Sequence, residues 1–192
     1  MKPDDTPVPT SLSPSPFPRY GHALPATTTA SGDLYIFGGL VRESARNDLY
    51  LYSTKDNTAT VLQCGGEVPS PRVGHTSSII SNVLIVWGGD TKTDVSSRGN
   101  EPHDDGLYLL NLGMCFLKPC ARLMFLDLIE SSHVPVSRDW TRVTVHGQAP
   151  IGRYGHAVAI VGTTFFVFGG QVDGLFLDDI WAFDLNTRMY RP

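Results

Sequence analysis

Short apolar runs separated by polar turns dominate the hydrophobic pattern of this chain. Three of these runs, LYIF, LIVW and FFVF, consist of four residues, many of them β-branched or aromatic, and each is followed directly by two glycines. Continuous apolar runs of this length are typical of strands buried on both faces. Behind each diglycine comes an acidic residue and then a segment with aromatics two residues apart, which indicates a further strand. The pattern therefore predicts an antiparallel β protein.

The same arrangement occurs three times along the chain. Each copy carries Arg-x-Gly-His near its start and ends with the diglycine, and the copies span 18–39, 71–89 and 152–170. The strands predicted to follow as third and fourth strands of the units are 47–53, 104–112, 177–185, 58–63 and 139–145. Repeated units of four short antiparallel strands are typical of propeller blades. The third unit stops at NTRMYRP, and we expect it to lack its fourth strand.

Certain residues mark equivalent positions in the three units. Because glycine adopts positive φ easily, we expect each diglycine to end a second strand. We expect the repeated histidines to cap strands by hydrogen bonds. A metal site is the alternative, but successive blades would hold these histidines apart. The marker residues are His22, His75, His156, Gly38, Gly39, Gly88, Gly89, Gly169, Gly170, Tyr50, Tyr108, Trp181 and Trp140.

These motifs resemble the kelch repeat. The resemblance rests on Arg-x-Gly-His, the diglycine, the aromatic strand after it and Trp140 in a predicted fourth strand, and it covers 18–184 apart from 113–137. It implies an all-β fold, a partial kelch β-propeller of two to three four-stranded antiparallel blades. Kelch propellers close with about six or seven blades, within the usual range for propellers. The wording of the repeats is most similar to the fungal cell-end marker branch, the tip elongation aberrant type, which implies a role in cell polarity.

The remaining segments set the expected limits of the domain. Residues 1–16 are rich in proline and serine and lack the apolar core of a secretory signal, so we expect a disordered leader. Residues 17–192 would form the partial propeller, interrupted by an atypical insert at 113–137. From Tyr108 to Trp140 the second unit uses 32 residues where the first uses 8 from Tyr50 to Thr58, an excess of 24.

Three explanations fit the insert. Cys115 and Cys120 would supply only two of the four ligands that a structural zinc ion requires. A docking helix at 120–130 would follow Pro119 well, but it would place many apolar side chains on a surface turn. The favoured hypothesis is a translated intron or another gene-model artefact. Gly-Met-Cys fits codons that contain a common fungal donor site, and Val-Ser-Arg can supply the closing AG.

Composition narrows the classes of function and location. A net charge of -4 without a basic stripe argues against nucleic acid as a partner. Three cysteines form no disulfide framework, and no apolar run is long enough to be a transmembrane segment. We therefore expect a cytoplasmic protein, and the closer resemblance implies the cell cortex or the cytoskeleton.

The repeated arginines and the loops after the diglycines are the candidate partner-binding residues. Arg19, Arg72 and Arg153 either bond backbone carbonyls between blades, which is favoured, or bind a partner's carboxylate or phosphate at the channel mouth. In the second case, alanine at Arg72 and Arg153 would weaken partner capture without unfolding the domain. In the kelch family the loops on this face commonly bind partners, and here they are 40–47, 90–105 and 171–177. The other candidates within these loops are Arg42, Asp90, His103, Leu175 and Phe176.

No motif of catalysis stands out, so we expect neither an enzyme nor a cofactor. The chain has no nucleophile elbow, phosphate-binding loop, paired catalytic carboxylates or zinc signature. The leading hypothesis is a non-enzymatic interaction module with protein partners, a scaffold in cell polarity. The alternatives are a kelch-fold enzyme, either of the galactose-oxidase type or a specifier-type protein, and a membrane-traffic effector. An oxidase of that type uses a tyrosine cross-linked to a cysteine, and the surroundings of Cys64 match no such site.

Overall fold

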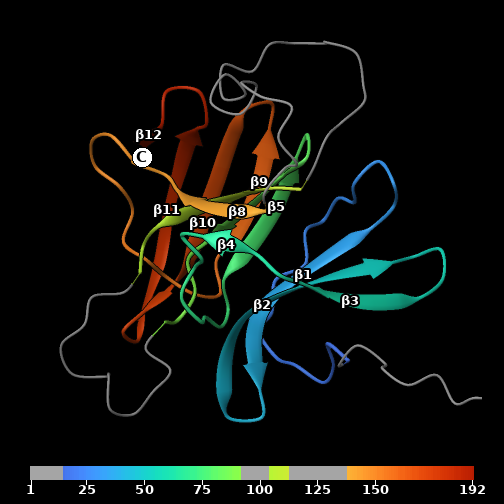
Figure 1. Ribbon diagram of the computed structural model, residues 1–192. Helices are drawn as coiled ribbons and strands as arrows, with labels where there is room; N and C mark the ends of the chain where they lie inside the picture. The colour runs from blue at the N-terminus through green and yellow to red at the C-terminus, as the bar shows by residue number, and fades with distance from the viewer. Residues whose placement is uncertain (1–14, 92–103, 113–137) are drawn as a thin grey trace, which may run out of the picture.

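The computed structural model describes residues 15–91, 104–112 and 138–192 (Figure 1). These residues form three separate sheets and contain no helix, so none that could span a membrane. The sheets follow one another in sequence order as blades, which confirms the all-β partial propeller. The predictions for His103, for the insert at 113–137 and for nearly all of the leader lie outside the described residues.

The first blade contains three strands in sequence order. They are β1 (Leu34–Val41), β2 (Ser44–Ser53) and β3 (Thr58–Leu62). The segment expected to be its first strand joins β1 only through two isolated bridges, Tyr20 to Leu40 and Ala23 to Phe37. Tyr50 lies on β2, the third strand of the repeat, as predicted.

The second blade contains the four predicted strands and one short addition. They are β5 (Thr76–Ile80), β6 (Val83–Trp87), β7 (Leu107–Asn111), β8 (Asp139–Arg142) and the two-residue β4 (Gly65–Gly66). Trp140 lies on β8 and Tyr108 on β7, as the repeat predicted. The addition β4 pairs in parallel with β8, so the end of the first unit is bonded to the outer strand of the second.

The third blade is complete, against expectation. Its strands are β9 (Ala157–Val161), β10 (Thr164–Val172), β11 (Leu175–Asp184) and β12 (Met189–Arg191). The prediction of a missing fourth strand was wrong, because β12 pairs with β11 through Ala182–Arg191 and Phe183–Tyr190. Tyr190 is buried, with its ring centroid 4.7 Å from that of Phe183, so one aromatic residue anchors a strand of three residues.

The diglycines end only one of the three second strands. β6 ends at Trp87, directly before its diglycine, as expected. β1 and β10 instead continue through theirs, with a shift of register between Phe37 and Gly39 in β1 and an equivalent shift in β10. The two glycines of β1 have φ values of 60° and 90°, and such conformations produce a β-bulge that bends a strand without ending it.

The core consists of two apolar clusters, each in the contact between two neighbouring blades, which we call a joint. On β6, Leu84 and Val86 face the first blade, while Ile85 and Trp87 face the third, and all four are fully buried. Trp140 from β8 belongs to the joint between the first and second blades. The continuous apolar runs in the sequence thus reflect strands covered on both faces.

Candidate functional site

Backbone hydrogen bonds near the channel axis connect the Arg-x-Gly-His segments of successive blades. The N–H of Gly74 donates to the carbonyl oxygen of Gly21 at 2.8 Å, and the N–H of Gly155 donates to that of Gly74 at 2.9 Å. The diglycines add one bond at each joint: Gly39 to the Arg72 carbonyl at 2.9 Å and Gly89 to the Arg153 carbonyl at 2.8 Å. The motif therefore holds each blade to the one before it.

The histidines of the second and third repeats are buried in the joints. His75 packs edge-on against Phe37 of the blade before, and its Nε2 lies 3.0 Å from the Phe37 carbonyl oxygen. His156 packs in the same way against Trp87, and its Nε2 lies 2.7 Å from Thr76 Oγ1. Within the described ranges, no three metal-ligating side chains gather into a group. The geometry supports the structural role for these histidines.

We expect the domain to lose stability as the pH falls from about 6.5 towards 4. Burial, with a neighbouring arginine charge adding to it, lowers the pKa of His75 to about 3 and that of His156 to about 4. The unfolded chain protonates both rings below 6.5 while the folded chain keeps them neutral. The free energy of unfolding then falls by up to about 3 kcal/mol per pH unit for the two rings together.

Urea denaturation at pH 7, 6 and 5 measures this loss. The variant His156→Gln, which keeps a hydrogen-bonding group but cannot take up the proton, should show about half the slope. Equal free energies of unfolding at pH 7 and pH 5 in the unmodified chain would contradict the expected coupling.

The three repeated arginines are buried within their own blades. The side chain of Arg72 is completely buried, and those of Arg19 and Arg153 are nearly so. Arg72 donates to the Gly88 carbonyl oxygen at 2.8 Å and to Asp104 Oδ2 at 2.5 Å. The equivalent bonds in the other blades tie an arginine to a diglycine carbonyl and to one carboxylate. We call these three ion pairs the Arg–Asp clamps: Arg19–Asp48, Arg72–Asp104 and Arg153–Asp179.

Each clamp joins the end of a second strand to the start of the third. In the second blade the guanidinium also lies over the ring of Tyr108, 5.2 Å from its centroid, and the Tyr108 hydroxyl donates to Asp104. Partial burial alone would raise the pKa of Asp104, but the Arg72 charge and three hydrogen bonds hold it below its usual value. Burial and the Asp104 carboxylate raise the pKa of Tyr108 to about 12.

This geometry corrects the expectation that the repeated arginines contact a partner. Arg19, Arg72 and Arg153 lie beneath the loops with their guanidinium groups already bonded, so they present no free fork at the channel mouth. Their bonds to the diglycine carbonyls lie within a blade, and only their backbone carbonyls reach across a joint. The structure favours the structural alternative, in which the clamps support the loops from below.

Sequence reasoning missed the acidic halves of the clamps. Asp48 and Asp179 each stand two residues before the marker aromatic of the third strand, and Asp104 stands four residues before Tyr108. An acidic residue in this place in all three units was visible as a pattern. Its pairing with an arginine some thirty residues earlier was not, because the two approach each other only when the hairpin forms.

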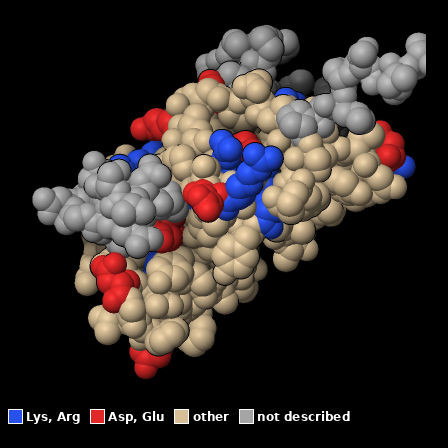
Figure 2. Space-filling model, turned by 90° about the horizontal axis from the view of Figure 1, so that it is seen from below, with Lys and Arg blue, Asp and Glu red and all other residues tan. Residues whose placement is uncertain are grey.

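The loops above the clamps all lie at the same end of the molecule, the lower end in Figure 1. We call this end the loop face and define it by the turn 41–44, the strand ends at 90–91 and 104–105, and the turn 172–176. Figure 2 views the molecule from this side and shows basic and acidic side chains close together on an otherwise uncharged surface. In the third-blade turn, Asp173 and Gly174 both have positive φ, as a two-residue hairpin requires.

The other candidates on the loop face differ in their exposure. Arg42 is exposed at the tip of the first hairpin, and Asp90 is half-buried beside Val73, to which it is bonded through the backbone. Leu175 and Phe176 are 68% and 84% exposed. The structure thus places two adjacent apolar side chains and one free arginine on the loop face, at the tips of different blades.

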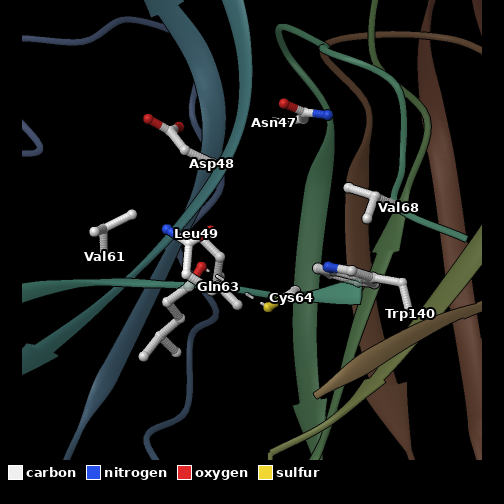
Figure 3. Close-up of a pocket in the computed structure, with 9 residues that line it drawn as sticks. Asn47, Asp48, Leu49, Val61, Gln63, Cys64, Val68 and Trp140 are labelled. Atoms are coloured by element: carbon white, nitrogen blue, oxygen red, sulfur yellow. Dashed lines mark hydrogen bonds between the residues drawn. The ribbon is translucent and has the colours of Figure 1, made fainter. Parts of the chain in front are cut away.

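A shallow pocket of about 220 Å³ opens between the first and second blades (Figure 3). Its ionisable groups are Asp48, which is held by Arg19, and Cys64. Burial raises the pKa of the Cys64 thiol, which makes it a poor nucleophile at neutral pH. No acid, base or nucleophile in this pocket is positioned against another for catalysis.

The comparisons with known proteins agree with this geometry. The family model described as the KLHDC2/KLHL20/DRC7 Kelch-repeats domain matches residues 21–192. The chain is 36% identical over 171 residues to Tip elongation aberrant protein 1 of Schizosaccharomyces pombe, which covers 88% of the chain and 13% of that relative. It is 32% identical over 185 residues to Kelch repeat-containing protein 2 of Saccharomyces cerevisiae, covering 92% of the chain and 18% of that relative.

A third relative comes from another kingdom. The chain is 30% identical over 164 residues to the Rab9 effector protein with kelch motifs of Mus musculus, which covers 85% of the chain and 36% of that relative. The chain therefore spans between 13% and 36% of the length of these three relatives. With three blades, three clamps and a family match over nearly the whole described domain, the chain belongs to the kelch-repeat family.

Proposed function

We propose that this chain is a non-enzymatic module that binds a protein partner through its loop face. The observation that carries the proposal is the exposure of Leu175 and Phe176 on a hairpin whose base is fixed by the Arg153–Asp179 clamp. Exposed apolar side chains on a rigid support are typical of interaction sites, because their burial drives association while little order has to be created. Arg42 on the first hairpin adds a fork for a carboxylate of the partner.

The partner that we propose belongs to the cell-polarity machinery at the cell cortex. The similarity to Tip elongation aberrant protein 1 and to Tip elongation aberrant protein 3, at 36% and 27% identity, supports this role. The second candidate is a membrane-traffic effector, which the similarity to Rab9 effector proteins of several vertebrates favours. Both roles would use the same loop face.

Site-specific photo-crosslinking tests the binding face. A photo-reactive residue in place of Arg42 or Leu175 should capture the partner in living fungal cells, and the double variant Leu175→Ser/Phe176→Ser should reduce that capture by an order of magnitude or more. A photo-reactive residue in place of Lys55, which is exposed at the opposite end, is the matched control and should capture nothing specific. Equal capture from position 55 would overturn the assignment of the face.

The location of a fluorescent fusion tests the cellular role. Enrichment at growing cell ends would support the polarity role, whereas enrichment on internal vesicles would favour the traffic effector. An even distribution that the double variant does not change would contradict both roles.

A further inference from the structure

The two ends of the three-blade stack are faces built like joints. The front face belongs to the first blade and points away from the second; it includes Phe17, Tyr20 and Leu24. The rear face belongs to the third blade and also points away from the second; it includes Val161, Phe168 and Ile180. Each of these six apolar side chains is at least 49% exposed. On β10 the alternate residues Phe165 and Val167 are fully buried against the second blade, so the rear face is the opposite side of the same strand.

The rear face has an empty position at the channel axis. In the first joint a Cβ on Gly21 would lie 2.5 Å from Val73, and in the second a Cβ on Gly74 would lie 3.2 Å from Tyr154. The side chain after the repeated arginine thus covers the glycine of the blade before. At Gly155 the equivalent space is open, with nothing within 4 Å, while at the front face Tyr20 occupies the position of the covering side chain and is exposed.

The histidine contacts repeat the same relation. The first glycine of the pair faces His75 in the first joint and His156 in the second, at 2.9 and 2.5 Å from the position a Cβ would take. At Gly169 on the rear face, a Cβ would meet only a carbonyl of its own blade. His22 holds the matching position on the front face, where its ring packs against Phe17 of its own blade.

The front and rear faces are therefore the two halves of one more joint. Each half already exists in complete form inside the chain: the first blade presents to the second what the rear face presents to solvent, and the second presents to the first what the front face presents. A front face thus fits a rear face, whereas two front faces or two rear faces would bring like halves together. Such a head-to-tail contact gives a ring if the rotation closes and a filament if it does not.

The number of blades decides how many copies close a ring. Propellers close with about four to eight blades. The described residues of one chain supply three blades, which is too few; two copies supply six, and three copies would supply nine. We propose that two copies of this chain associate front face to rear face and form a closed six-bladed ring, with a two-fold axis along the channel.

Sedimentation velocity on the 192-residue chain tests the proposal. The unmodified chain should have twice the monomer mass. Phe168→Glu on the rear face and Leu24→Glu on the front face should each leave only monomers, because every joint of the ring needs one intact face of each kind. An equimolar mixture of the two variants should form a dimer again, held by the one remaining joint. Val68→Glu, a change at an exposed valine outside both faces, is the matched control and should stay dimeric.

Other outcomes would overturn the ring. A monomeric unmodified chain would mean that something else covers the two faces, such as further blades of a longer product. Dimers of Phe168→Glu alone would show that like faces pair, and species that grow with concentration would show an open filament. Far-UV circular dichroism confirms that each variant is folded, and Ile180→Lys replaces Phe168→Glu if the latter unfolds. The variant Leu175→Ser/Phe176→Ser serves to separate partner binding from ring closure, since it should lose the partner and remain dimeric.

Discussion

Replacing Arg72 with alanine is expected to lower the free energy of unfolding by roughly 3 to 5 kcal/mol. The fully buried guanidinium bonds the Gly88 carbonyl oxygen, the Ser70 carbonyl oxygen and the Asp104 carboxylate. Without it, Asp104 is left as a partly buried charge with no cation in the same place, and two buried carbonyls lose their donors. Breaking a buried pair by removing one partner costs far more than the pair contributes on balance, because the remaining charge is no longer compensated.

The control for this prediction is Arg42→Ala on the loop face. Arg42 is an exposed arginine in the same chain, and its loss should change the free energy of unfolding by less than about 0.5 kcal/mol. Urea denaturation of both variants at equal chain concentration measures the difference. A folded Arg72→Ala variant of unchanged stability that captures partner poorly would restore the original hypothesis of a contact residue.

Replacing Gly88 with alanine is expected to cost roughly 2 to 5 kcal/mol. A Cβ at this position would lie 2.5 Å from His156 Cε1 and 2.6 Å from the Arg153 carbonyl oxygen, so the joint between the second and third blades would have to open. Gly88 also has a φ of 73°, in the left-handed region, which costs a residue with a Cβ about 1–2 kcal/mol.

Gly174→Ala separates the two contributions to this loss. Gly174 has a φ of 83°, and a Cβ there would meet nothing within 4 Å, so this variant carries the backbone cost alone. Thermal or urea denaturation should therefore show a clearly larger loss for Gly88→Ala. Equal losses in the two variants would mean that the joint yields to an added methyl group without cost.

The strands could be predicted because their hydrophobic pattern is strong and repeated. The run LIVW predicted a strand buried on both faces, and β6 is fully buried from Leu84 to Trp87. Trp140 marked the fourth strand of the second blade correctly, although more than thirty residues separate its strand from the start of β7. A pattern of period two or a continuous apolar run depends only on near neighbours in the sequence, so it can be read without knowing the fold.

The burial of the arginines could not be predicted in this way. Arginine is rarely buried, and it becomes so only where a carboxylate and several carbonyls converge on it. For Arg72 these groups come from three places in the chain, the farthest being Asp104, 32 residues away. The strand β12 escaped prediction for a related reason, since only the packing of Tyr190 against Phe183 makes three residues a strand.

The glycine bonds along the channel also have a direction. Each peptide group carries a dipole, and the bonds from Gly155 to Gly74 and from Gly74 to Gly21 join these dipoles head to tail around the axis. The series begins with the N–H of Gly21 and ends with the carbonyl of Gly155, so one end is partly positive and the other partly negative, as in a short helix. A blade offered upside down would bring donor against donor. Electrostatics of the main chain therefore sets the one orientation in which another blade can be added, whichever side chains lie around it.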